Sequence, residues 1–191
     1  MKLKFWLMDP SPYGDARLPH QRYPPKGVTI SEFTADTGAM YYSLSLGDVQ
    51  KEKQRLETIR RECGLANENA VHIMNPEITP DFEDKINCVF DSSLCNETHA
   101  EGRIIVEGEA YFDVLCRDRA NWIRAHLTPG DMLVLPKKTV YRFCVTTTNN
   151  LKMRRFTSDD AEPRNETPSK SLPKATGTTA TTTPLQSSNA Q

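Results

Sequence analysis

Residues 103–156 read RIIVEGEAYFDVLCRDRANWIRAHLTPGDMLVLPKKTVYRFCVTTTNNLKMRRF, and this stretch decides the fold. Short runs rich in β-branched, aromatic and other apolar residues alternate in it with turn-forming segments such as Glu107-Gly108 and TPGD at 128–131. Five or six strands at a spacing of about ten residues are typical of antiparallel sandwiches and barrels. We therefore predict strands at 103–106, 110–116, 122–127, 132–136, 140–145 and 151–156.

The residues before this stretch predict a first helix over 47–64. Its apolar positions Leu56, Ile59 and Cys63 lie three and four residues apart, and Gly64 stands where a glycine often ends a helix. The charged run QKEKQRLETIRRE at 50–62 is interpreted as the solvated face of this helix.

A second helix is predicted to begin at Thr79-Pro80, with the threonine as its cap and the proline at the first helical position. Its buried stripe would consist of four apolar residues, Phe82, Ile86, Val89 and Phe90. Residues 39–46, AMYYSLSL, lie between turn residues and are predicted to form a strand.

The charge balance of the chain excludes some classes of protein. The 191 residues carry 24 basic and 25 acidic side chains, for a net charge of -1. An electrostatic nucleic-acid binder or a polybasic membrane protein needs an excess of one sign. The apolar run before Asp9 is too short for a signal-peptide core, and no run approaches a membrane span. We expect a soluble intracellular protein with neither nucleic acid nor membrane as partner.

The cysteines do not predict a metal ribbon or a disulfide framework. There are five of them, they are scattered, and no C-x-x-C pair occurs. Reduced thiols are the ordinary state of such cysteines in an intracellular protein. The five residues are Cys63, Cys88, Cys95, Cys116 and Cys144.

The last 35 residues, 157–191, differ in composition from the rest of the chain. Eight Thr, five Ser and four Pro make up half of them, and no aromatic residue occurs. Such a segment buries too little apolar surface to offset its ordering entropy. We therefore predict a disordered tail at 157–191.

Seven short motifs together resemble one known family. They occur in the order found in the acireductone dioxygenases, and the resemblance covers about residues 3–156. Spacings from Glu101 to Gly108 and from Gly130 to Pro136 also resemble the two halves of the cupin signature. The motifs are LMDPSPYGDARLPH (7–20), IRRECG (59–64), FEDKI (82–86), YFDV (111–114), NWIR (121–124), GDMLVLP (130–136) and YRF (141–143).

The resemblance implies a mainly β fold. It implies a cupin-type double-stranded β-barrel core at 93–156, an N-terminal α/β extension at 1–92 packed on it, and the disordered tail at 157–191. It also implies descent from an enzyme of methionine salvage, which cleaves an acireductone with dioxygen and uses iron or nickel. Members of the family occur in the cytoplasm and in the nucleus, so both locations are expected here.

The family holds its metal with three histidines and one glutamate, and the resemblance assigns these ligands to positions of this chain. It places the glutamate at Glu101 and a following arginine, which helps to position the substrate oxygens, at Arg103. The three histidine positions fall on Cys95, Glu97 and Tyr141. Glu101 is thus the only family ligand present. An alternative interpretation of Arg103 is a surface salt bridge.

These replacements alter the chemistry of the site. Tyr141 is a neutral phenol at pH 7 and a poor ligand, while a thiolate at Cys95 and a carboxylate at Glu97 would favour zinc over iron or nickel. Lys138 replaces the glycine of the second motif and brings a cation near the site. The family's aromatic C-terminal segment is replaced by TSDDAEPRNET at 157–167. We expect no metal cofactor and no catalytic residue.

One alternative metal site remains open. In a continuous strand, Cys95, Glu97, His99 and Glu101 would all point to one face, because side chains alternate along a strand. If instead a turn lies between these residues, the parity fails and His99 is simply exposed. The other histidines, His20, His72 and His126, are interpreted as surface or hydrogen-bonded core residues.

Three functions follow as hypotheses. The first is an inactive acireductone dioxygenase-like protein that has lost the metal site. The second is an altered metal-dependent dioxygenase that uses Cys95, Glu97, His99 and Glu101. The third is a metal-free module that binds a small molecule in the barrel or a protein partner, with the tail as a tether. A monomer is expected.

Overall fold

The computed structural model describes residues 3–44, 47–96, 98–158 and 169–170. Within these ranges lie three helices and eleven strands. No helix among them has the length and apolar character needed to cross a membrane. The predicted tail falls outside the described ranges except for Thr157, Ser158 and residues 169–170.

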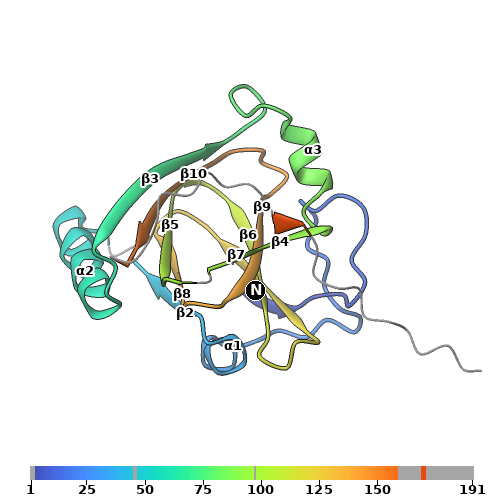
Figure 1. Ribbon diagram of the computed structural model, residues 1–191, viewed down its shortest axis with the longest axis horizontal. Helices are drawn as coiled ribbons and strands as arrows, with labels where there is room; N and C mark the ends of the chain where they lie inside the picture. The colour runs from blue at the N-terminus through green and yellow to red at the C-terminus, as the bar shows by residue number, and fades with distance from the viewer. Residues whose placement is uncertain (1–2, 45–46, 97, 159–168, 171–191) are drawn as a thin grey trace, which may run out of the picture.

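Two antiparallel sheets face each other across a common core and form a barrel (Figure 1). The first sheet has the order β1 (Phe5–Leu7), β7 (Trp122–Leu127), β6 (Ala110–Leu115), β9 (Val140–Val145), β4 (Ser92–Cys95) and β11 (Ser169–Lys170). The second has the order β2 (Met40–Ser43), β8 (Asp131–Leu135), β5 (Glu101–Gly108), β10 (Leu151–Thr157) and β3 (Asn67–Met74).

All six strands predicted in the second half of the chain are present as β5 to β10. The tight turn after β5 depends on Gly108, whose φ of 75° is in the left-handed region. A Cβ atom there would lie 1.9 Å from the carbonyl oxygen of Asn150. The strand predicted at 39–46 is observed as the shorter β2, and residues 45–46 lie outside the described ranges.

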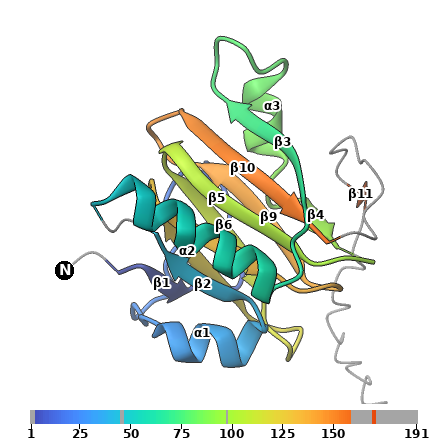
Figure 2. The ribbon, with the colours of Figure 1, turned by 90° about the vertical axis from the view of Figure 1, so that its left-hand side faces the viewer.

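The first predicted helix is confirmed as α2 (Val49–Glu62). The Asp48 side chain caps it by accepting hydrogen bonds from the amides of Gln50 and Lys51. Leu56 and Ile59 are buried and pack against the outer face of the second sheet (Figure 2). Most charged positions of α2 are exposed on the other side of this apolar stripe, but Arg60 is largely buried and lies over the Phe156 ring.

The predicted start of the second helix was wrong. The observed helix α3 (Phe82–Asn87) begins three residues after Thr79. Its N-cap residue is Asp81, whose backbone is in the left-handed conformation. The hydroxyl of Thr79 accepts a hydrogen bond from the Asn75 amide, and the Asn75 side chain bonds Glu77 and Ile78. Thr79 therefore closes the preceding turn and does not cap the helix.

The end of this helix also differs from the prediction. α3 stops at Asn87, so only Phe82 and Ile86 of the expected stripe are helical. Val89 is buried and Phe90 is half-buried in the loop that follows. All four side chains contact the core, as their apolar character predicts.

Four elements of the N-terminal part were not predicted. They are β1, β3, β4 and α1 (Ile30–Thr37). The helix α1 begins with a capping box, in which the side chains of Thr29 and Glu32 each accept a hydrogen bond from the other's backbone amide. The T-x-x-E pattern of this capping box is visible in the sequence, and our sequence analysis missed it. β1 and β4 are very short, and β3 is a largely exposed edge strand with the polar sequence NENAVHIM. These strands therefore show no alternation of apolar and polar residues long enough to predict them from the sequence.

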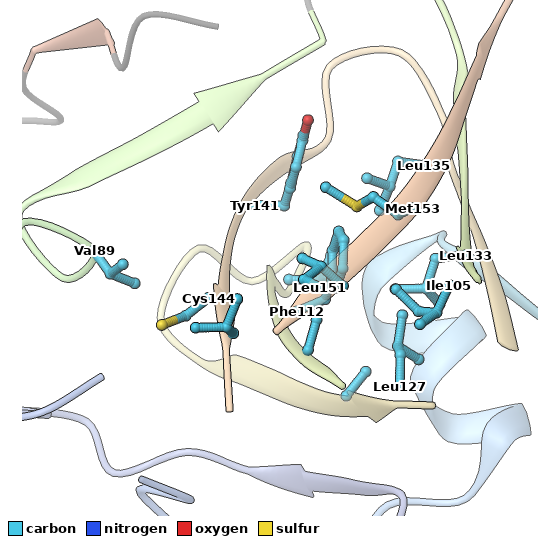
Figure 3. Close-up of a cluster of buried hydrophobic side chains, with 14 of the residues drawn as sticks. Val89, Ile105, Phe112, Leu127, Leu133, Leu135, Tyr141, Cys144, Leu151 and Met153 are labelled. Atoms are coloured by element: carbon cyan, nitrogen blue, oxygen red, sulfur yellow. The ribbon is translucent and has the colours of Figure 1, made fainter. Parts of the chain in front are cut away.

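Apolar side chains from both sheets fill the barrel (Figure 3). Phe112 on β6, Leu133 on β8 and Met153 on β10 are fully buried. Tyr141 on β9 closes the cluster at one end, and its hydroxyl group points away from the apolar side chains. This hydroxyl is buried at that end of the cluster, where it contacts Arg103 and Glu101.

A buried ion-pair cluster joins the N-terminal segment to the first sheet. Asp113 on β6 accepts hydrogen bonds from Arg124 on β7, at 2.6 and 2.8 Å, and from Arg142 on β9, at 3.0 Å. Arg124 also donates to the carbonyls of Ala16 and Leu18. Burial lowers the pKa of Arg142, whereas Asp113 acts in the opposite direction.

Four of the motifs noted in the sequence supply this cluster, three with side chains and one with backbone carbonyls. Asp113 belongs to YFDV, Arg124 to NWIR and Arg142 to YRF, while Ala16 and Leu18 belong to LMDPSPYGDARLPH. The cluster lies on the outer face of the first sheet, since each of its side chains alternates with an inward-facing neighbour. These motifs therefore maintain the fold.

Candidate functional site

The candidate site is formed by three strands at the polar end of the barrel. Glu101 and Arg103 point inward from β5, and Tyr141 points inward from β9 in the opposite sheet. Arg155 on β10 lies directly opposite Arg103 in the antiparallel register. These four side chains, here called the Glu101 cluster, come from positions up to 54 residues apart in the sequence.

The carboxylate of Glu101 is the centre of the cluster and is completely buried. Arg103 Nε forms a short hydrogen bond and ion pair with Oε1. Arg155 Nη2 donates to Oε2 at 3.1 Å, and the Tyr141 hydroxyl donates to Oε1 at 3.3 Å. Both carboxylate oxygens therefore accept hydrogen bonds from cationic side chains of the protein itself.

The second guanidinium nitrogen of Arg103 links the cluster into a ring. Its Nη2 donates to the Tyr141 hydroxyl at 3.2 Å, so that Glu101, Arg103 and Tyr141 each contact the other two. The guanidinium carbon also lies 5.3 Å from the centre of the Phe143 ring. Arg103 is 1% exposed, so its interpretation as a surface salt bridge was wrong: the ion pair is buried.

The Glu101 cluster does not fit a divalent metal ion. A metal would have to replace two guanidinium groups on the one retained carboxylate, and arginine does not lose its charge in proteins. Two cations next to a third, divalent one also oppose its binding. Among the described residues, no group of three or more His, Cys, Asp and Glu side chains is placed to hold a metal.

The alternative ligands do not lie along one strand. Cys95 is the last residue of β4, half-buried and paired with Val140 on β9, whereas Glu101 begins β5. The chain between them turns, so the alternation expected of a continuous strand fails. Glu97 lies outside the described residues. Most of the segment 157–167 lies outside them as well.

His99 lies in the same turn, but it is not exposed. Its side chain is 3% exposed, and Nδ1 lies 3.2 Å from the Thr98 hydroxyl. The expectation that a turn would expose this histidine was therefore wrong, because the turn folds back over the end of the barrel. Ser158, which follows β10, donates its amide to the carbonyl of Ala100 in this turn.

The other histidines are hydrogen-bonded or packed, as predicted. His126 is buried, and its Nε2 lies 2.8 Å from Glu109. His20 Nε2 lies 2.8 Å from the carbonyl of Asp15. His72 on β3 is half-buried against the Phe143 ring. None of the three belongs to the Glu101 cluster.

Arg155 is the site residue that the sequence analysis missed. The signal for it is the alternation of LKMRRF, in which Leu151, Met153 and Arg155 share one parity. An arginine on the buried side of a strand requires a carboxylate partner, and such a requirement is a sign of a buried polar cluster. Only the strand pairing shows that the partner is Glu101.

Comparison with known proteins agrees with this architecture. A model of the ARD/ARD' family matches residues 4–164. The "Probable inactive acireductone dioxygenase 2" of Caenorhabditis elegans is 36% identical over 158 residues, which cover 83% of this chain and 98% of that protein. The "Acireductone dioxygenase" of Ixodes scapularis is 36% identical over 152 residues, covering 79% of this chain and 80% of that protein.

A solved structure shows the same fold at low sequence identity. The acireductone dioxygenase from Bacillus anthracis, with a cadmium ion in its active centre, superimposes with a TM-score of 0.56 at 15% identity. The match covers 69% of this chain and 84% of that one. This likeness confirms the predicted cupin-type β-barrel. The family model and the two relatives show that the chain belongs to the acireductone dioxygenase (ARD/ARD') family.

Proposed function

We propose that this chain is a catalytically inactive member of the acireductone dioxygenase family, in which internal arginine–carboxylate pairs occupy the place of the metal centre. The observation that supports it most directly is the double ion pair of Glu101 with Arg103 and Arg155. A carboxylate in this arrangement neutralises protein cations, and a metal would have to compete with a guanidinium group at either of its oxygens.

The ligand positions that the family resemblance assigns support the same proposal. The resemblance assigns the three metal-binding histidines to Cys95, Glu97 and Tyr141, none of which is a histidine. Tyr141 donates its hydroxyl proton to Glu101 and accepts from Arg103, so it acts as part of the buried network. Two nematode relatives carry the same description of a probable inactive enzyme.

The family motifs that this chain contains supply residues that stabilise the fold, and this role does not require catalysis. Asp113, Arg124 and Arg142 hold the N-terminal segment on the barrel, and Gly108 allows a turn that no other residue fits. Removal of any of these residues would disrupt folding, and none of them stands at a family ligand position. In this proposal the chain descends from an enzyme of methionine salvage, works without iron or nickel, and is a cytoplasmic or nuclear monomer.

Elemental analysis tests the proposal. The full chain is expressed in medium supplemented with iron and nickel, next to the Ixodes scapularis relative as a control. We expect less than about a tenth of an equivalent of any transition metal in this chain. We also expect no consumption of acireductone under oxygen above the rate without protein. One equivalent of metal together with acireductone cleavage would overturn the proposal.

A metal bound without activity would separate the two parts of the proposal. If one equivalent of zinc copurifies and is lost in Cys95→Ser, the site has been rebuilt and the metal-free statement is wrong. Glu68→Gln is the matched control, because Glu68 is exposed and pairs with Arg154 on the outer face of β10. That variant is expected to leave metal content unchanged.

A further inference from the structure

A separate cavity of about 260 Å³ lies outside the barrel, beside the end that holds the Glu101 cluster. Its wall is formed by the C-terminal end of α1, the β6–β7 turn and the β8–β9 turn. Val140 lines this cavity, whereas the next residue, Tyr141, points into the barrel. Because neighbouring side chains of a strand point to opposite faces, the cavity and the Glu101 cluster are two sites.

The wall of this cavity is rich in positive charge. Arg117, Arg119, Lys137 and Lys138 all line it, and no carboxylate side chain does. Among the described residues, none of these four side chains forms an ion pair with an acidic group. The guanidinium of Arg117 donates to the carbonyl of Ala35 and so satisfies the end of α1. The other three cations have no protein partner that the structure describes.

Two carboxylates lie near the cavity, but neither of them lines it. Asp36 and Asp118 both raise the pKa of the buried Cys116 thiol, although its burial is the larger cause. The Asp118 side chain is turned into its own loop, where it accepts hydrogen bonds from Ala120 and Asn121. These bonds, first of all that from the Ala120 amide, lower the pKa of Asp118.

Two of the cations occupy a strained backbone conformation. Arg119 has φ of 61° and Lys138 has φ of 66°, in the left-handed region that favours glycine. The Lys138 amide bonds the carbonyl of Asn96, so the strained turn is fixed. The family resemblance places a glycine at position 138, where the backbone would be free of strain. Strained residues cluster at functional sites, so two strained cations at one cavity support a binding role.

We propose that this cavity binds a phosphate-type oxyanion, either inorganic phosphate or a small phosphate monoester, between Arg119, Lys137 and Lys138. Arginine matches the geometry of phosphate oxygens, and two lysines add charge that suits a dianion. The volume of about 260 Å³ is slightly below the range of about 300–1,000 Å³ for small-molecule sites, which limits the ligand to a phosphate with at most a small attached group.

Titration at constant ionic strength tests this proposal. Sodium phosphate and glycerol 3-phosphate are titrated into the full chain, and amide chemical shifts and calorimetry report binding. We expect saturable binding, with shifts confined to residues 116–119 and 136–140. Sodium acetate, a monoanion, is expected to give no saturable shift. Equal affinity for the two phosphates indicates free phosphate as ligand, and tighter binding of glycerol 3-phosphate indicates an ester.

Lys138→Gly provides the sharpest variant, because it removes the cation and relieves the backbone strain together. We expect phosphate affinity to fall by about tenfold or more, while the melting temperature stays the same or rises. Lys137→Ala should lose affinity to a similar degree without any change of backbone. Lys85→Ala is the control: it removes an exposed lysine of α3, at the opposite end of the molecule from α1 (Figures 1 and 2).

Two results would overturn the proposal. The first is a phosphate titration that does not saturate or that acetate reproduces, since either result means general ionic screening. The second is an affinity that is equal in Lys138→Gly, Lys137→Ala and Lys85→Ala. Both results are independent of the metal content, so failure here leaves the proposed loss of catalysis untouched.

Discussion

Arg155 on β10 lies directly opposite Arg103 on β5, and the two guanidinium groups share one carboxylate, that of Glu101. Like charges in directly opposed positions of a sheet destabilise it. Here the repulsion is offset because the anion lies between the two cations and is completely buried. The arrangement makes Glu101 the counter-ion of two buried arginines, with one guanidinium group on each carboxylate oxygen.

Removal of the carboxylate should therefore destabilise the fold strongly. In Glu101→Ala, both guanidinium groups stay buried without this partner, which costs about 3–5 kcal/mol for a broken buried ion pair. Urea denaturation measures the free energy of unfolding. Glu68→Ala, which breaks an exposed pair with Arg154, is the control and should cost about 1 kcal/mol or less. Similar losses in both variants would contradict the structural role of Glu101.

Restoration of the three histidines should not be sufficient for tight metal binding. The triple variant combines Cys95→His, Glu97→His and Tyr141→His. In this variant, Arg155 still donates a hydrogen bond to one carboxylate oxygen of Glu101. Adding Arg155→Ala should raise nickel affinity by about tenfold or more, because it frees that oxygen and removes a cation. Isothermal titration measures the affinity once circular dichroism shows folded protein.

The neighbour of Arg155 provides a control for this series. Arg154 points to the outer face of β10 and pairs with Glu68. Arg154→Ala added to the triple-histidine variant removes the same charge from the same strand, yet it should leave nickel affinity unchanged. An equal gain from Arg154→Ala and Arg155→Ala would show that total charge, and not the contact with Glu101, controls the metal.

The Asp113 cluster should control attachment of the N-terminal segment. Asp113→Ala leaves Arg124 and Arg142 buried without their carboxylate, so stability should fall by about 3 kcal/mol or more. Hydrogen exchange should become faster first at residues 8–20, because Arg124 then holds the carbonyls of Ala16 and Leu18 less firmly. Unchanged exchange in this segment would show that other contacts attach it.

Two glycines with the same sign of φ should respond very differently to alanine. Gly108→Ala places a methyl group 1.9 Å from the Asn150 carbonyl oxygen, so we expect a loss of about 3 kcal/mol or more. Gly64→Ala, with φ of 66° and no atom within 4 Å of the new methyl, should lose only about 1 kcal/mol from backbone strain. Thermal denaturation compares the two variants, and equal losses would mean that the β5 turn relaxes.

The cysteines should react with iodoacetamide in an order set by burial. Burial raises the pKa of Cys144 to about 12 and, with Asp118 and Asp36, that of Cys116 to about 11. A raised pKa keeps these thiols protonated at pH 8, where the exposed Cys88 should be alkylated first. Mass spectrometry of the native protein follows each site. Early labelling of Cys144 would contradict its burial.

Local sequence signals were sufficient for much of the barrel. The six runs between residues 103 and 156 became six strands because each combines apolar, β-forming residues with turn residues at its ends, and four of the five turns between them contain glycine or asparagine. The cap Asp48 and the glycine Gly64 likewise bound α2. These signals act within a few residues, so the sequence displays them directly. The prediction that Thr79 caps α3 was wrong because its hydroxyl accepts a hydrogen bond from the Asn75 amide instead.

Tertiary structure alone decided the chemistry of the site. The sequence showed Glu101 as a lone acidic residue at a family ligand position, and it showed Arg155 as one of several basic residues near the end of the barrel. Their contact depends on the register between β5 and β10, where a shift of one residue would turn Arg155 to solvent. A composition with balanced charge also gave no sign of the basic cavity, since its four cations come from two turns that only the folded barrel brings together.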